Sequence, residues 1–191
     1  MPRKQRPWFP GAIYHITCRG NRKTPIFYDR EDYLYYQYLL KKTNRRHPFN
    51  LHAYCLMPNH THLLLETTVS PPGEAMGYLN TQYAKYINRK YDLVGHVFQG
   101  RYGASLIDSM MYLIDVSRYI HQNPVAALMV LNAEDYEWSS YSHYIAAGLD
   151  PGVKVKTEYI LSQFPAPKQE NYKSFIEGAE YGDIVRRAPV L

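Results

Sequence analysis

Cysteine is scarce in this sequence, and long hydrophobic segments are absent. The 191 residues include two cysteines, Cys18 and Cys55, which lie far apart and outside any CxxC pair. A disulfide-stabilised scaffold and a cysteine-rich zinc site are therefore excluded. The longest unbroken apolar run covers residues 125–131, well short of the roughly 18 residues that span a bilayer. The charged N-terminus has no apolar signal segment, so we expect a cytoplasmic protein with reduced thiols and no membrane partner.

The length and composition fit one globular domain with an added C-terminal segment. Hydrophobic residues make up 46% of the chain and charged residues 20%, a balance that favours a folded chain over a disordered one. The 22 Lys and Arg against 17 Asp and Glu give a net charge of +5, which suits a polyanionic partner. The hydrophobic pattern weakens after Gly148. We therefore expect a main domain over residues 1–148, with a basic N-terminal arm, and a tail or accessory element over residues 149–191.

Hydrophobic periodicity predicts an α+β fold. Two-residue alternation indicates strands over residues 12–18, 49–57, 60–67 and 97–107, and helical spacing indicates helices over residues 29–46, 74–91, 108–123 and 138–147. This order matches the split βαβ arrangement of a ferredoxin-like sandwich, an antiparallel sheet with helices on one face, here followed by additional C-terminal helices.

Local signals add detail to this fold. Asp29 and Asp32 have the spacing of a helix N-cap and the third helical residue. Pro124 is expected to end a helix at Asn123, because proline disfavours helical backbone before it. The odd-numbered residues of 49–57 are all apolar, so we expect them to share one face of their strand.

The segment His60-Thr61-His62 is the first candidate for chemistry. Residues i and i+2 of a strand point to the same face, roughly 6.6 Å apart at Cα, so the two imidazoles can converge on one metal ion. Two polar histidines on a solvated sheet face would give the same pattern.

Tyr119 and Asn123 are the second candidate. Four residues apart on a helix, they share a face, and a phenol and a carboxamide oxygen can approach a metal ion together. A packed aromatic ring and an asparagine at a helix end explain the same residues without chemistry. Spacing alone leaves both interpretations open.

Several ordered segments together resemble a known family. They are Tyr14-His15-Ile16-Thr17-Cys18-Arg19-Gly20-Asn21, Met57-Pro58-Asn59-His60-Thr61-His62-Leu63-Leu64, Phe98-Gln99-Gly100-Arg101-Tyr102, Arg118-Tyr119-Ile120-His121-Gln122-Asn123-Pro124-Val125 and Trp138-Ser139-Ser140-Tyr141. Over about residues 10–147 the chain resembles the HUH single-tyrosine transposases, and most closely the REP-associated tyrosine transposases. Thr61 departs from the family pattern, which usually has a bulky hydrophobic residue between the histidines, and we expect Thr61 to face the core.

The resemblance implies nicking and strand transfer on single-stranded, REP-like hairpin DNA through a 5′-phosphotyrosine intermediate. Tyr119 matches the nucleophile, and His60, His62 and Asn123 match the metal site, whose ion we expect to be Mg²⁺ or Mn²⁺. A phenol has a pKa near 10, so a nearby cation helps to generate the reactive phenolate. The covalent step conserves the phosphodiester, and a second 3′-OH can therefore rejoin strands without ATP.

Polar and basic side chains near the matched segments are candidates for holding the DNA. They are Arg3, Lys4, Arg6, Arg19, Asn21, Arg22, Gln99 and Arg101. The resemblance implies that the folded DNA strand is read partly near the N-terminus. Each of these side chains also fits an ordinary solvated surface.

Two alternatives remain at this stage. One is a domesticated, sequence-specific DNA-binding protein without strand transfer, and the other is a metal phosphodiesterase that activates water instead of Tyr119. The sequence allows either a monomer or a homodimer.

Overall fold

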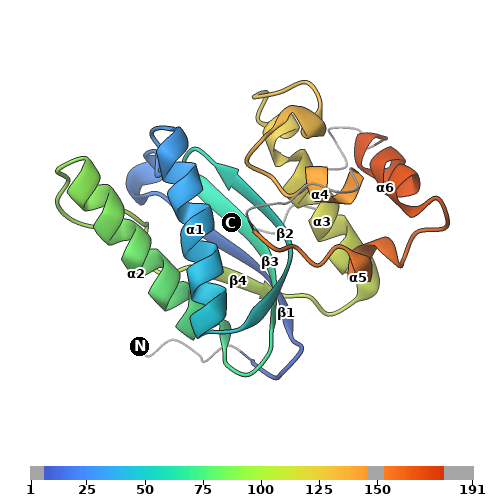
Figure 1. The fold of residues 1–191 in the computed structure, drawn as a ribbon, viewed down its shortest axis with the longest axis horizontal. Helices are drawn as coiled ribbons and strands as arrows, with labels where there is room; N and C mark the ends of the chain where they lie inside the picture. Colours follow the sequence, from blue (N-terminus) through green and yellow to red (C-terminus); the bar gives the residue numbers. More distant parts are fainter. Residues whose placement is uncertain (1–6, 146–152, 179–191) are drawn as a thin grey trace.

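A computed structural model of the chain describes residues 7–145 and 153–178, and a four-stranded antiparallel sheet lies at its centre (Figure 1). The strands are β1 (Ile13–Arg19), β2 (Phe49–Met57), β3 (His60–Thr67) and β4 (Gly103–Leu106). They lie in the order β2-β3-β1-β4, and each neighbouring pair is antiparallel. The predicted α+β fold with a split βαβ order is confirmed.

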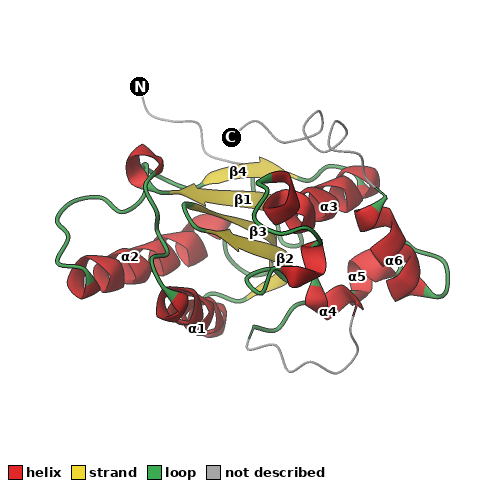
Figure 2. Ribbon diagram, turned by 90° about the horizontal axis from the view of Figure 1, so that it is seen from above, coloured by secondary structure: helices red, strands yellow, loops and turns green. Residues whose placement is uncertain are grey.

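Two long helices, α1 (Arg30–Arg46) and α2 (Pro72–Lys90), pack on one face of the sheet (Figure 2). They contact each other and enclose the larger of two hydrophobic clusters. As predicted, Asp29 caps α1: its carboxylate accepts from the backbone N–H of Asp32, and the Asp32 carboxylate accepts from the backbone N–H of Asp29. This capping box satisfies N–H groups that the helix leaves unpaired.

The opposite face of the sheet is covered by the C-terminal half of the chain. Its helices are α3 (Met110–Ala126), α4 (Ser142–Ile145), α5 (Glu158–Leu161) and α6 (Lys168–Glu177). Ile120 of α3, Ile160 of α5 and Ile176 of α6 are fully buried in the second hydrophobic cluster, with Leu64 of β3. Of the described residues after 148, Ile160, Tyr172 and Ile176 pack on this face, whereas Val153 packs in the cluster under α1 and α2. The division of the chain at residue 148 stays a prediction.

The middle of β2 corrects one expectation about side-chain direction. The odd-numbered residues of 49–57 do not share a face, because the pairing with β3 is irregular between Leu51 and Ala53. Phe49 and Leu51 pack in the cluster under α1 and α2, whereas Ala53 and Cys55 pack in the cluster under α3. An inserted residue in one strand shifts every later side chain to the other face. β2 therefore contributes apolar side chains to both layers.

Three predicted boundaries were also wrong. The strand predicted over 97–107 is limited to β4, because Gly100 has a φ of +83°, which extended backbone does not adopt. The helix predicted over 138–147 is limited to α4 among the residues described. Pro124 does not end α3: the helix continues to Ala126, and the Ala127 N–H still donates to the Asn123 carbonyl. A proline this close to the end of a helix removes few hydrogen bonds.

Short turns join these elements. A 3₁₀ turn, η1 (Asn21–Lys23), follows β1, and a second one, η2 (Ala133–Asp135), follows α3. Within the described ranges, none of the helices combines the length and the apolar character that a membrane crossing requires.

We expect Gly20→Ala to destabilise the protein and Gly77→Ala to stabilise it. A Cβ at Gly20 would lie 2.0 Å from the backbone oxygen of Thr24, so the turn after β1 has to move, at a cost of about 2 kcal/mol. A Cβ at Gly77, inside α2, meets nothing within 4 Å, and alanine should add about 0.5–1 kcal/mol there. Urea unfolding of both variants measures the difference. Equal stability of the two would contradict the close approach of Thr24 to Gly20.

Candidate active site

The two histidines of β3 project from the face of the sheet that α3 covers. Between them, Thr61 points to the opposite face, where its Oγ1 lies 3.5 Å from the hydroxyl of Tyr36 on α1. The expected direction of Thr61 toward the core is therefore confirmed. The imidazoles of His60 and His62 lie 4.8 Å apart between ring centroids, and they are nearly perpendicular. His62 is fully buried and His60 is half-buried, so the pair does not lie on a solvated sheet face.

Tyr119 of α3 lies directly beside these rings. Its ring centroid is 5.4 Å from that of His62, at an angle of 88°. Asn123, one helical turn later, hydrogen-bonds to His60. Both Tyr119 and Asn123 are half-buried, so solvent reaches them. The structure thus brings the four predicted residues together within one chain, from β3 and from α3.

One ring nitrogen at this site has no partner. His62 Nε2 is buried, and it makes no hydrogen bond within the described part of the chain. An unpaired buried polar atom is costly, and such atoms in native proteins often mark the place of an ion or a ligand. A divalent cation bound through an imidazole nitrogen would satisfy it. The donor set of His60, His62 and an amide oxygen from Asn123 fits such an ion.

The protonation of the rings also fits metal binding. Burial, together with the nearby rings of His15 and His60, lowers the pKa of His62 well below its usual value. Burial likewise lowers the pKa of His60, and the charge of Arg19 acts in the same direction, while the hydrogen bond with Asn123 opposes them. Both rings are therefore neutral near pH 7, which is the form that binds metals.

No group of three or more His, Cys, Asp or Glu side chains is placed to hold a metal ion in residues 7–145 and 153–178. The carboxylate-rich metal centres of many nucleases are therefore not found in this part of the chain. A cation bound to His60 and His62 has to complete its shell with amide, water or substrate oxygen.

His15 of β1 is a site residue that the sequence pattern did not single out. Its Nε2 lies 2.9 Å from Nδ1 of His62, and the two rings stack with centroids 5.1 Å apart. Burial lowers the pKa of His15 to about 4, so one neutral ring donates to the other. When His62 donates through Nδ1–H, its Nε2 keeps the lone pair that a metal requires. Such a second partner fixes the tautomer and the orientation of a metal-binding histidine.

A buried polar network holds α3 in place. His121 Nδ1 lies 2.8 Å from the hydroxyl of Tyr172 on α6, and its Nε2 lies 2.8 Å from Oγ of Ser140. Ser140 in turn accepts from the backbone N–H of Tyr54 on β2, and Tyr172 donates to Ser117 of α3. Burial lowers the pKa of His121 to about 3, so the ring is neutral and has one donor and one acceptor nitrogen. The network connects the helix that carries Tyr119 to both β2 and α6.

Three of the predicted DNA-binding residues gather at the same end of the sheet as His60. Arg19 is paired directly with His60 across β1 and β3. The backbone N–H of Gln99 donates to the Arg19 carbonyl at 2.8 Å, and the N–H of Asn21 donates to Val97 at 2.8 Å. Arg19 therefore lies beside His60, and the backbone bonds hold Asn21 and Gln99 at the same end of β1.

The other predicted DNA-binding residues are less closely tied to the site. Arg22 and Arg101 are exposed in the loops after β1 and before β4. Arg22 has a φ of +53°, a left-handed conformation that is uncommon outside glycine and that tends to occur at functional sites. Arg3, Lys4 and Arg6 lie outside the described residues.

Comparison with known proteins points to one family. The family model described as "Transposase IS200 like" matches residues 9–123, a span that contains all four residues of the candidate site. A Haemophilus influenzae protein described as a REP-associated tyrosine transposase is 26% identical over 175 residues, which cover 82% of this chain and 98% of that protein.

A solved structure gives the same fold. It is a REP-associated tyrosine transposase bound to a REP hairpin, and it superposes with a TM-score of 0.66 at 20% sequence identity. The superposition covers 82% of this chain and 92% of that chain. The likeness therefore extends beyond the sheet and the first two helices.

We expect His15→Ala to weaken Mn²⁺ binding about 10- to 100-fold while the protein stays folded, because His62 loses the partner that sets its tautomer. Mn²⁺ titration followed by electron paramagnetic resonance measures the affinity. His143→Ala removes a half-buried imidazole on α4 and serves as the control with unchanged affinity. Equal affinity in the His15 variant and wild type would contradict the assigned contact.

Proposed function

Because the chain belongs to the family of IS200-like transposases, we propose that it nicks and rejoins single-stranded hairpin DNA, with Tyr119 as the nucleophile and a divalent cation as cofactor. The observation that carries this proposal is the placement of the Tyr119 ring 5.4 Å from the ring of His62, whose Nε2 is buried without a partner among the described residues. A tyrosine packed only for stability gives no reason for an unpaired imidazole nitrogen beside it.

His60, His62 and Asn123 would hold the cation. Mg²⁺ or Mn²⁺ suits this set, because amide and phosphate oxygens accompany the imidazoles. A bound cation of this kind polarises the scissile phosphate and favours the ionised phenol. His15 keeps the His62 ring in the orientation in which Nε2 is available, and Oδ1 of Asn59 lies 2.6 Å from Nδ1 of His60. The histidine orientations are thus set by the protein before any ligand arrives.

In the chemical step, the phenol oxygen of Tyr119 bonds to the scissile phosphorus as the bond from phosphorus to O3′ breaks. The phenolic proton leaves the nucleophile, and the departing O3′ gains a proton, which leaves a 5′-phosphotyrosine and a free 3′-OH. One phosphodiester is exchanged for another, so attack by a different 3′-OH reverses the step and joins two strands. α3 contributes by holding Tyr119 at a fixed place over the sheet.

The proposed substrate is a DNA hairpin with an unpaired segment at the cleavage point. The solved relative is bound to a REP hairpin, and this chain has Arg19 beside His60, with Asn21 and Gln99 at the same end of β1. A guanidinium and side-chain amides there can contact phosphates and base edges of a strand that lies over the metal site. The basic arm with Arg3, Lys4 and Arg6 is proposed to add phosphate contacts.

We expect Tyr119→Phe to abolish a covalent protein–DNA adduct, because the variant lacks the attacking oxygen. The test incubates the protein with a labelled hairpin-bearing single strand and Mn²⁺, then separates denatured products on a gel. Tyr112→Phe, two turns earlier on α3, removes a hydroxyl from the same helix and should leave the adduct intact.

The same gel distinguishes the alternatives. Cleavage that survives in the Tyr119→Phe variant would indicate attack by water and would contradict the proposed nucleophile. Tight binding by the wild-type protein without any cleavage would instead indicate a DNA-binding protein that has lost strand transfer.

We expect His60→Ala, or removal of divalent cations with EDTA, to lower the cleavage rate at least about 100-fold without unfolding the protein. His60 is only half-buried, so the variant leaves a smaller cavity than a substitution of the fully buried His62. Thermal melting checks the fold, and exposed His96→Ala is the matched control. Undiminished cleavage in EDTA would contradict the metal-dependent mechanism.

A further inference from the structure

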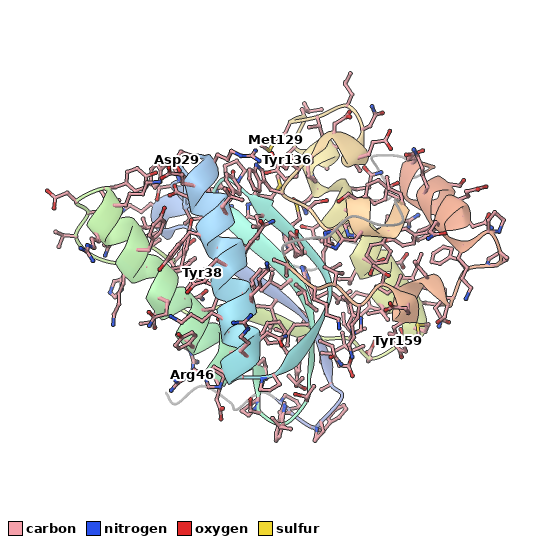
Figure 3. All side chains as sticks on the ribbon, in the orientation of Figure 1. Asp29, Tyr38, Arg46, Met129, Tyr136 and Tyr159 are labelled. Carbon is pink, nitrogen blue, oxygen red and sulfur yellow. The ribbon has the colours of Figure 1, made fainter. Side chains whose placement is uncertain are left out.

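A basic groove lies away from the candidate active site, between the end of α1, the start of β2 and the segment that leads into α5. It has a volume of about 660 Å³. Four cationic side chains line it, Lys41, Arg45, Lys154 and Lys156, together with Asn44 and Asn50. Figure 3 labels Arg46 at the same end of α1 and Tyr159 on α5. Among the described residues, no carboxylate lines the groove.

The segment that carries two of the lysines has a fixed conformation. Its sequence, Val-Lys-Val-Lys over residues 153–156, alternates: Val153 is 5% exposed in the core, whereas Lys154 and Lys156 are exposed. The N–H of Lys156 donates to the Leu51 carbonyl of β2 at 2.8 Å, and the Lys156 carbonyl lies 3.1 Å from Nδ1 of buried His52. The two lysines are therefore presented from backbone that is tied to the sheet edge.

The groove cations lack close carboxylate partners among the described residues, although Lys156 also lines an adjoining pocket that contains Glu66 and Glu158. None of the four cations forms an ion pair with an acidic side chain in the described part of the chain, whereas Lys90 and Lys173 each pair with more than one carboxylate. The dipole of α1 favours cations in its last turn and explains Arg45. It does not explain Lys154 and Lys156, which come from a separate extended segment. Like charges brought together across a groove repel one another unless an anion lies between them.

We propose that this groove binds the sugar-phosphate backbone of the DNA on which the active site acts. The side chains fit that ligand, since lysine and arginine neutralise phosphates. The amides of Asn44 and Asn50 already donate to the Phe49 carbonyl and to Glu66, and each keeps a second N–H that can donate to a phosphate or sugar oxygen. The proposal rests on the proposed function for the identity of the DNA. It adds a second contact surface, formed by residues outside the candidate active site, and it gives the C-terminal segment a part in binding.

The position of the groove sets the length of DNA that is needed. β2 pairs with β3 from Met57 opposite His60 at one end to Phe49 opposite Thr67 at the other, and the groove adjoins Phe49. About seven residue steps of about 3.4 Å separate the two ends by about 24 Å. Duplex DNA advances about 3.4 Å per base pair, so a hairpin stem that follows the edge strand β2 between the two faces has to be at least about seven base pairs long to reach both places.

The test compares a groove variant with a control of equal charge. Lys154→Gln with Lys156→Gln removes two groove cations, and Lys85→Gln with Arg89→Gln removes two exposed cations from α2. Affinity for a hairpin with a stem of about 12 base pairs is measured by fluorescence anisotropy over a range of salt concentrations. We expect the groove variant to bind about 10- to 60-fold more weakly at about 0.1 M salt, and to lower the salt slope by about 1.8. The double variant Lys154→Arg with Lys156→Arg keeps both positive charges, so it should show the affinity and the salt slope of the wild type.

Two further arms make the outcome decisive. A hairpin with a stem of about four base pairs should bind the groove variant and wild type equally, because it does not reach the groove. Equal losses in the groove variant and the α2 control would show an effect of net charge alone and would overturn the proposal. Inorganic phosphate at millimolar concentration that competes for the groove as effectively as DNA would also overturn the proposal, because the groove would then be a site for small anions.

An error in the proposed chemistry would give a different experimental result from an error in the assignment of the groove. Because the groove variant keeps Tyr119 and the two histidines of β3, it should form the covalent adduct at saturating DNA as fast as wild type. A wild-type protein that forms no adduct would contradict the proposed chemistry, yet the binding comparison would still decide whether the groove holds DNA.

Discussion

The seating of α3 on the sheet is the constraint on which the candidate active site depends. The two histidines come from β3 and the tyrosine from a helix more than fifty residues later in the chain, so no local structure holds them together. Buried Ile120 packs against the sheet beside Tyr119, and buried His121 is hydrogen-bonded on both ring nitrogens. These two neighbours of Tyr119 leave the helix little freedom to slide or rotate. Packing and a satisfied polar network thus position Tyr119, the proposed nucleophile, although its own side chain is half-exposed.

Much of the fold followed from periodicity and capping, because those signals are local. The Asp29 and Asp32 pair predicted the start of α1, and alternation over 49–57 and 60–67 predicted the central hairpin. The bulge in β2 was not predictable in this way, because it depends on how β2 pairs with β3, where Leu51 lies opposite Leu65 and Ala53 lies opposite Leu64. The alternation of Val153 to Lys156 was too short to predict an ordered segment, although its pairing with β2 makes it one.

The site shows the same division between local and long-range information. His60 with His62, and Tyr119 with Asn123, were identified from spacing and from resemblance, because each pair lies on a single element. His15 was missed, although it stands within a segment that resembles the family. Its contact with His62 is diagonal across β1 and β3, where Thr17 is the residue directly opposite His62. Only the register of two strands reveals such a neighbour. The signal that could have identified His15 was available: His15 alternates with buried apolar residues in a strand next to the one that carries His60 and His62.

The route of the chain also bears on when the candidate active site is assembled during synthesis. The sheet with α1 and α2 is complete once β4 has formed, so the imidazoles can be in register early. The contacts that fix α3 come later, from Ser140 and from Tyr172 near the end of the described residues. Synthesis must therefore pass Tyr172 before all the contacts that hold Tyr119 over the histidines can form. A translation product that ends before Tyr172 would retain the histidine pair yet lack the contact that fixes α3 from α6, so Tyr119 would be less firmly held.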